Sequence, residues 1–213
     1  MTGLVRKATL LTACGVLLAA AAMAGVPSPG NSSSPACISL VGAAAGAPDS
    51  VVGKFCVTVR DLANNPLNGS SVTVDLSNDQ DAIMCDNQLN ANYIVNCAAK
   101  TVRAFTNASG DVCFTILGGS DGGGNATNLL NAGRIYADGV LLTSPTVSIY
   151  DLDDVGGVGA NDLSAWFGDF GSGFAYGRSD YDCSGDIGAN DLSLWFGVFG
   201  AGTSSDSCTG NCP

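Results

Sequence analysis

The chain has 213 residues and a formal net charge of −11 at pH 7, and all 19 of its acidic residues are aspartates. It contains no histidine, which excludes histidine-based catalytic triads, zinc sites and general bases. Its eight Lys and Arg residues are too few for the basic footprint that nucleic acid requires, so no nucleic-acid partner is expected. Hydrophobic residues make up 46% of the chain and charged residues 13%, which predicts a folded core.

Residues 1–24 have the pattern of a signal peptide. Arg6 and Lys7 precede an apolar run over residues 8–22, and Ala22-Met23-Ala24 has the small-x-small pattern that a signal peptidase cleaves. The run is shorter than the roughly 20 apolar residues that a membrane span needs, and no other segment approaches that length. We therefore predict a secreted, extracellular protein with a bacterial export signal and no membrane span.

A lipoprotein signal is the alternative, because Leu11-Thr12-Ala13-Cys14 resembles a lipobox. Only six residues separate Lys7 from Cys14, however, which is short for the apolar region. After export eight cysteines would remain: Cys37, Cys56, Cys85, Cys97, Cys113, Cys183, Cys208 and Cys212. An even number in an exported chain predicts disulfide bonds. Strand alternation favours a Cys56–Cys113 bridge, and we expect Cys85–Cys97 as a local bridge.

The segment 25–36 has three prolines among Gly and Ser and is predicted to be a flexible leader. Over residues 37–150 apolar residues recur with period two between turn residues, which predicts an antiparallel β-sandwich. The clearest strand patterns lie at 55–59, 72–76, 112–116 and 147–150, and weaker ones lie at 93–95, 101–105 and 134–137. Residues 118–132 are ambiguous between a long loop and a short helix.

Three stretches at 57–61, 66–74 and 106–114 carry a strand, an Asn-x-Pro-x-x-Gly-like turn, a second strand and a turn into a core strand. This succession resembles bacterial Ig-like domains over about residues 50 to 120. The resemblance implies an Ig-like β-sandwich across 37–150 and implies no chemistry.

An internal repeat follows the β-rich region. Residues 159–173 recur as residues 188–202, a shift of 29 with 12 of 15 positions identical. Two copies of one supersecondary unit are therefore expected.

Each unit begins with spacing that suits calcium. A 12-residue calcium loop takes oxygen ligands from positions 1, 3, 5, 7 and 12 and has glycine at position 6. The second repeat provides Asp180, Asp182, Ser184, Asp186 and Asp191 at these ligand positions. Gly185 falls at position 6, where the sharp turn needs a positive φ. Ca²⁺ is the cofactor that this loop predicts.

The first repeat places Asp151, Asp153 and Asp162 at positions 1, 3 and 12, with Gly156 at position 6. Position 5 is Val155, whose side chain has no oxygen. Asp154 or water would have to replace that ligand, so we expect a weaker first site.

A short helix of about nine or ten residues should follow each loop, because apolar residues recur at i, i+3, i+4 and i+7. These residues are Leu163, Trp166, Phe167 and Phe170, and Leu192, Trp195, Phe196 and Phe199. Gly171 and Gly200 are expected to end the helices. At this spacing the tryptophans are expected to be core residues rather than sugar-stacking platforms.

A calcium loop followed by one helix, occurring twice, resembles the type I dockerin module over residues 151–202. The resemblance implies a small α module of two EF-hand-like calcium loop–helix units. Together with the β-rich region before it, this predicts a mostly-β protein that ends in an α module. The resemblance also implies a cohesin-like protein or surface scaffold as partner. In dockerins the residues at loop positions 10 and 11 often select the partner; here they are Ala160, Asn161, Ala189 and Asn190.

Taken together, these patterns predict a secreted, non-catalytic calcium-binding protein whose dockerin-like module docks it to an extracellular partner or surface assembly. No pattern places two carboxylates in a cleft, so no enzyme is expected. The alternative is a carbohydrate-binding accessory protein of an extracellular polysaccharide-degradation system, although few aromatic residues support glycan binding. The Cys-containing tail, 203–213, has neither an apolar stretch nor a basic cluster that would hold a membrane.

Overall fold

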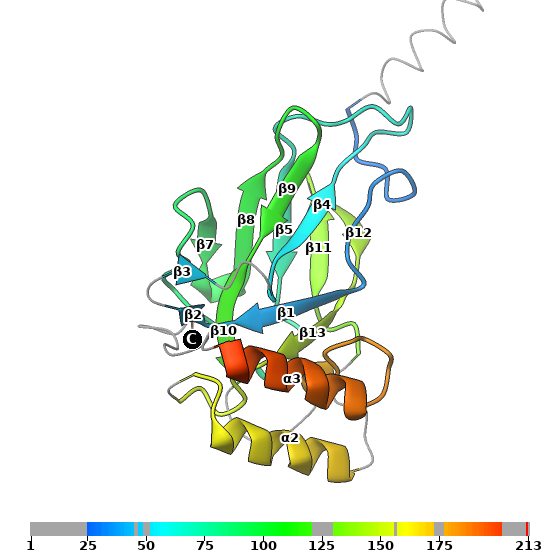
Figure 1. The fold of residues 1–213 in the computed structure, drawn as a ribbon. Helices are drawn as coiled ribbons and strands as arrows, with labels where there is room; N and C mark the ends of the chain where they lie inside the picture. Colours follow the sequence, from blue (N-terminus) through cyan, green and yellow to red (C-terminus); the bar gives the residue numbers. More distant parts are fainter. Residues whose placement is uncertain are drawn as a thin grey trace, which may run out of the picture.

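The structure is a computed structural model that describes residues 25–44, 47–48, 52–120, 130–155, 157–172, 177–201 and 212. The described chain is mostly β-strand and has two α-helices near its C-terminal end (Figure 1). The predicted signal peptide, 1–24, lies outside the described residues, and so does all of the predicted tail 203–213 except Cys212.

The strands form four ladders. A four-stranded sheet has the order β13 (Thr146–Ile149), β1 (Cys37–Val41), β10 (Ile116–Ser120) and β6 (Ala82–Met84). A five-stranded sheet has the order β12 (Val140–Thr143), β11 (Arg134–Ala137), β5 (Ser71–Asp75), β8 (Thr101–Phe105) and β7 (Ile94–Asn96). The two-stranded ladders are β4 (Phe55–Thr58) with β9 (Asp111–Phe114) and β2 (Ala43–Ala44) with β3 (Ala47–Pro48). A short 3₁₀ helix, η1 (Cys97–Ala99), connects β7 to β8.

Side chains from the four-stranded sheet, the five-stranded sheet and the β4–β9 ladder share one hydrophobic core. Alternate residues of β5 and β8 are buried in it, as period-two strands require. Phe114 of β9 is fully buried, and its ring lies 5.6 Å from that of Phe55 and 5.4 Å from that of Tyr93. Burial of each large apolar side chain contributes about 1.5–3 kcal/mol, so this cluster holds the ladders together.

Every predicted strand pattern corresponds to a strand, but the prediction of a wholly antiparallel structure is wrong. β1 pairs in parallel with both β10 and β13, with Leu40 opposite Ile116 and Cys37 opposite Thr146. Parallel partners need long connections, and alternation within one strand carries no information about its neighbour or direction. The strands β1, β2, β3, β6 and β12 were not predicted. Of these, β2 and β3 have only two residues each and β6 has three.

Part of the ambiguous segment 118–132 belongs to β10, while residues 121–129 lie outside the described residues. All five residues of β10 are buried, so no alternation marks the strand. Gly118 is required there by close approach, because a Cβ would collide with the carbonyl oxygen of Ile83 on β6.

The segment 25–36 is paired rather than a flexible leader. Ser33 and Thr58 exchange backbone hydrogen bonds of 2.9 Å, and the Ser28 N–H donates to the Arg60 carbonyl at 2.8 Å. Gly and Pro residues indicated a break in regular structure but could not show that this irregular segment lies along β4.

The two repeated units form helices α2 (Ala160–Ser172) and α3 (Ala189–Ala201), which lie together at one end of the strands (Figure 1). Each has 13 residues, so both are longer than predicted. Gly171 and Gly200 lie in the last turn instead of ending the helix. A 3₁₀ helix, η2 (Gly177–Ser179), precedes the second loop and contacts β13.

Three disulfide bonds join described cysteines. The predicted Cys56–Cys113 bridge is confirmed, and its cysteines are opposite each other in the β4–β9 ladder. The predicted Cys85–Cys97 bridge is wrong, because Cys97 is bonded to Cys212 and the Cys212 N–H donates to the Met84 carbonyl. Proximity in sequence favoured a local bridge, whereas folding returns the C-terminal end to β6. The third bond joins Cys37 of β1 to Cys183.

Candidate metal centres

The second loop brings three of its predicted ligands together. Asp180, Asp182 and Asp191 each offer a carboxylate oxygen, and these oxygens all lie within 4.8 Å of one another. Asp180 and Asp191 are buried, while Asp182 is exposed. Gly185 at loop position 6 has φ +89°, as the sharp turn requires.

The first loop repeats this arrangement with Asp151, Asp153 and Asp162, whose carboxylate oxygens also lie within 4.8 Å of one another. Asp151 is only 3% exposed, and its Oδ1 has no hydrogen-bond partner among the described residues. A buried carboxylate oxygen without a partner is costly unless a cation or donor meets it. The predicted position-6 glycine, Gly156, lies outside the described residues.

The closing aspartates have a second role at the start of each helix. Asp162 accepts backbone hydrogen bonds from Leu152 and Gly159, both 2.6 Å, and from Asp153 at 3.1 Å. Asp191 repeats the set, accepting from the backbone N–H groups of Tyr181, Asp182 and Gly188. Each carboxylate therefore holds the start of its loop against the first turn of the helix, and it also satisfies the N–H group of the residue just before the helix.

The other predicted ligands of the second loop, Ser184 and Asp186, are exposed. Ser184 Oγ donates to Asp186 Oδ1 at 2.8 Å, and the Asp186 side chain is not part of the carboxylate cluster. Position 7 of a calcium loop contributes its backbone carbonyl, which does not need the side chain. In the first loop Val155 is 68% exposed at position 5.

Burial and mutual repulsion oppose ionisation in both clusters. Burial, followed by the negative charges of Asp162, Asp154 and Asp153, raises the pKa of Asp151 to about 7. Burial also raises the pKa of Asp162 and that of Asp180. A hydrogen bond from Ser184 lowers the pKa of the exposed Asp182. A bound divalent cation would offset the repulsion, and clustered carboxylates are the hard oxygen donors that Ca²⁺ takes.

The buried faces of the helices differ from the predicted apolar stripe. On α2 the buried residues are Asp162, Trp166 and Asp169, whereas Phe167 and Phe170 are about half exposed, at 50% and 52%. The corresponding buried residues of α3 are Asp191, Trp195 and Val198. Both tryptophans are 1% exposed and belong to the core, so they are not surface platforms for sugars. Aspartates occupy the inward face because each carboxylate has buried hydrogen-bond partners. Hydrophobic periodicity alone does not predict such buried polar residues.

Asp169 forms a buried ion pair that the sequence patterns did not predict. Arg178 donates from Nε and Nη2 to its two carboxylate oxygens at 2.8 and 2.7 Å, and Arg178 Nη1 lies 3.7 Å from Asp81 Oδ2. All three side chains are buried. Asp81 precedes β6, so this ion-pair network joins the helical unit to the four-stranded sheet.

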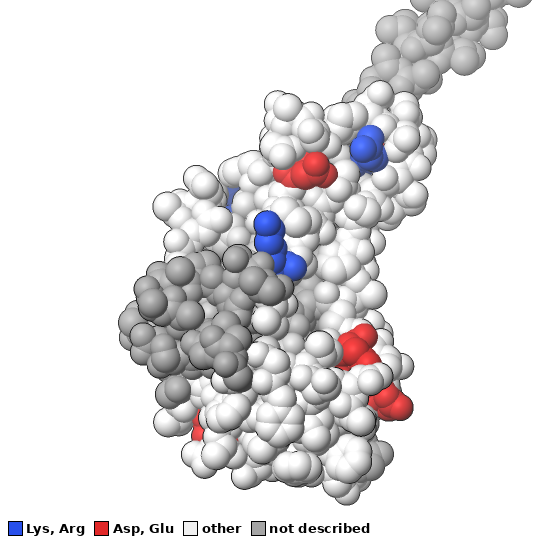
Figure 2. All heavy atoms as spheres, viewed as in Figure 1, with Lys and Arg blue, Asp and Glu red and all other residues white. Residues whose placement is uncertain are grey.

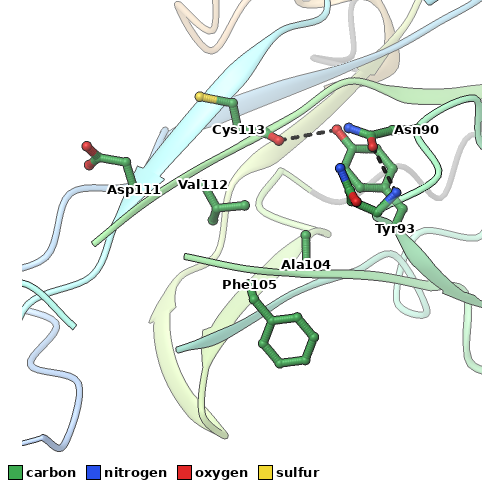
Figure 3. A pocket seen from close by; sticks show the side chains of 8 residues that line it. Asn90, Tyr93, Ala104, Phe105, Asp111, Val112 and Cys113 are labelled. Carbon is green, nitrogen blue, oxygen red and sulfur yellow. Dashed lines mark hydrogen bonds between the residues drawn. The ribbon is translucent and has the colours of Figure 1, made fainter. Parts of the chain in front are cut away.

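A surface cavity of about 400 Å³ lies between β8 and β9 (Figure 3). Its polar groups serve local structure: Tyr93 Oη donates to the Cys113 carbonyl at 3.2 Å, and Asn90 Oδ1 accepts from the Asn92 N–H at 3.0 Å. The Phe105 side chain points away from Tyr93 (Figure 3). Tyr93 and Phe105 are the aromatic residues of the cavity lining.

Charged groups are sparse on the face shown in Figure 2, where acidic and basic side chains are scattered among uncharged surface. No helix within the described part of the chain has the length and apolar character to cross a membrane. The three disulfide bonds are compatible with an extracellular protein.

Comparison with protein-family models, with curated proteins and with solved structures found no match. The two carboxylate clusters are therefore interpreted from their own geometry and from the internal repeat.

Proposed function

We propose that this protein binds two Ca²⁺ ions, one in each repeated loop. The observation that carries the proposal is the recurrence of one geometry: the aspartates at positions 1, 3 and 12 converge within 4.8 Å in both loops. The unpartnered Asp151 Oδ1 adds independent support for a cation in the first loop. Oxygen-only donors favour Ca²⁺ over the softer transition metals.

Calcium titration of the full chain by calorimetry tests this proposal. We expect uptake of two ions, with Asp182→Ala removing the second-loop ion and Asp153→Ala removing the first-loop ion. Asp186→Ala is the matched control, because position 7 would bind through its backbone carbonyl. Absence of uptake at millimolar calcium would reject the proposal.

We interpret the two loop–helix units as a dockerin-like module and the strands as an Ig-like sandwich. The loop-then-helix order of both repeats and the shared core of the ladders support this interpretation. On it, the protein is a secreted, non-catalytic calcium-binding protein that docks to an extracellular protein or scaffold.

Exposed residues on the helices support docking. Each unit presents one small polar face at its helix start, formed by Ala160, Asn161 and Ser164 and by Ala189, Asn190 and Ser193, all of them exposed. Phe167 and Phe196 lie one turn further along and are about half exposed, at 50% and 48%. Exposed aromatic residues are enriched in protein interfaces.

Capture of one exported protein by the immobilised full chain, with release by a chelator, is the expected result. Ser164→Arg alone should weaken capture little if either face serves, whereas Ser164→Arg with Ser193→Arg should abolish it. Capture that survives the double substitution or the chelator would leave the module with a structural calcium role only. A glycan array would test the alternative carbohydrate-binding function directly.

A further inference from the structure

Position 4 has the same unusual backbone in both loops. Asp154 in the first loop has φ 53°, and Cys183 in the second has φ 57°. Few residues other than glycine adopt this left-handed conformation, because their Cβ crowds the backbone. In the second loop position 4 lies between the ligands predicted at positions 3 and 5, so its conformation decides whether they face the same point.

In both loops the position-4 residue contacts the four-stranded sheet. Cys183 is covalently bonded to Cys37 of β1. Asp154 lies against Gly119 of β10, where an added Cβ would be 2.9 Å from Asp154 Oδ1. β1 and β10 are neighbours in that sheet. Next to this contact the Ser120 N–H donates to the Asp151 carbonyl at 2.8 Å.

We propose that the position-4 residues lock the two calcium loops onto β1 and β10, and that the Cys37–Cys183 disulfide preorganises the second loop for its ion. This inference rests on the proposed calcium binding and adds positioning residues to it. Without the ion, the clustered carboxylates repel one another and favour opening of the loop. The disulfide opposes that opening because it restrains Cys183 between two ligands. A ligand set that is already in place loses less conformational freedom when the ion binds.

The test compares variants of the full chain that all carry Asp153→Ala, so that only the second loop is titrated. Cys37→Ser with Cys183→Ser should weaken calcium binding by about tenfold, since restraint of one left-handed residue is of that order. Cys56→Ser with Cys113→Ser is the matched control, because it removes a disulfide distant from the loops. Its calcium affinity should stay within about twofold, while both double variants lower the melting temperature in chelator.

A variant with glycine at position 4 distinguishes preorganisation of the second loop from a general loss of stability. Cys37→Ser with Cys183→Gly also lacks the disulfide, but glycine adopts the left-handed conformation without strain. Its calcium affinity should recover part of the loss, because glycine removes the strain of the left-handed conformation but not the freedom that the disulfide restrains. Its melting temperature in chelator should stay low. Equal affinity of the glycine and serine variants would overturn the proposed role of the backbone at Cys183.

The first loop gives a test that keeps every disulfide and therefore covers a failure of the cysteine variants to fold. In an Asp182→Ala background, Gly119→Ala should displace Asp154 and weaken first-loop calcium binding several-fold. Three results would each overturn the inference. The first is unchanged first-loop calcium affinity in the Gly119→Ala variant. The second is wild-type calcium affinity after loss of the Cys37–Cys183 bond, and the third is an equal loss of calcium affinity in the Cys56–Cys113 control. Absence of calcium uptake by the unmodified chain would instead reject the calcium proposal itself.

Discussion

Asp191 and Asp182 belong to the same carboxylate cluster but differ in burial. Asp191 is 1% exposed and accepts three backbone hydrogen bonds, whereas Asp182 is exposed. Loss of a charged acceptor leaves buried N–H groups without partners, and each such group costs about 1–3 kcal/mol. The closing aspartate therefore supports the fold even when no ion is bound.

We expect Asp191→Ala to lower the free energy of unfolding by about 2–4 kcal/mol in chelator, because buried donors lose their acceptor. Asp182→Ala should change it by less than about 0.5 kcal/mol, as exposed substitutions do. Both should weaken calcium uptake. Urea unfolding in chelator measures the first effect, and equal stability losses in the two variants would contradict this account.

Asp79 is a buried acidic residue outside the calcium loops. It is 1% exposed; its Oδ1 accepts from the N–H groups of Asp81 and Ala82, and its Oδ2 has no partner among the described residues. Burial raises the pKa of Asp79 from 3.8 to about 6, and the charge of Asp81 adds to this shift. Between these two pKa values the folded protein binds more protons at Asp79 than the unfolded chain does. The contribution of Asp79 to stability therefore falls as pH rises from about 4 to 6 and stays low above that range.

Asp79→Asn should raise the free energy of unfolding at pH 7 by about 1–3 kcal/mol, because the amide keeps an acceptor and removes a buried charge. Near pH 4, where the folded protein already holds Asp79 neutral, the effect should largely disappear. Urea unfolding from pH 4 to 7 in chelator is the measurement. Parallel pH curves for the two proteins would show that Asp79 does not titrate in this range.

The helices α2 and α3 have nearly the same sequence but different buried faces. Asp169 of α2 corresponds to Val198 of α3, and both are buried. Asp169 is tolerated because Arg178 and Ser179 donate hydrogen bonds to its carboxylate. A buried ion pair of this kind does not by itself imply high stability, since a packed hydrophobic pair is often as stable.

Arg178→Met should lower the free energy of unfolding by about 3–5 kcal/mol, because it leaves two buried carboxylates without their cation. Adding Asp169→Val, the residue that α3 has at this position, should restore at least half of the loss. The comparison is again made by urea unfolding. A double variant no more stable than Arg178→Met would show that Asp81, rather than Asp169, depends on Arg178.

In the whole molecule, the helical unit is part of the β-structure rather than a separate appendage. The Tyr150 and Tyr181 rings stack at 4.4 Å, and Tyr181 Oη donates to the Ile149 carbonyl at 3.1 Å. The Cys37–Cys183 disulfide and the Arg178–Asp81 ion pair cross the same boundary. A boundary at residue 150 thus marks a change of composition, while packing continues across it.

A fragment of residues 151–202 should consequently fold poorly. Without β1, β13 and the Asp81 carboxylate it loses the disulfide, the tyrosine stack and one ion-pair partner. We expect weaker calcium binding than in the full chain, by more than about tenfold, together with reduced helical circular dichroism. Full helicity and full affinity in the isolated fragment would show that these contacts are dispensable.

The amino-acid sequence by itself determined the features that depend on local spacing. Period two located most of the strands but not β1, β2, β3, β6 or β12. The 29-residue repeat located two loop–helix units, and the positions of six aspartates predicted both carboxylate clusters. The Cys56–Cys113 bridge was also predictable, since alternation put both cysteines on one face of neighbouring strands. These features follow from covalent spacing and backbone period, which the chain carries regardless of its long-range contacts.

Only the tertiary structure decided which distant segments meet. Four features had no local signal in the sequence: the parallel pairing of β1, the bonding of Cys97 to Cys212, the exposure of Phe167 and Phe196, and the link from Cys183 to Cys37. Each depends on which of many chain segments packs against another, and that choice is made by the free energy of the whole core. Position 4 shows the difference most clearly: the repeat aligns Asp154 with Cys183, but only the fold brings both against neighbouring strands of one sheet.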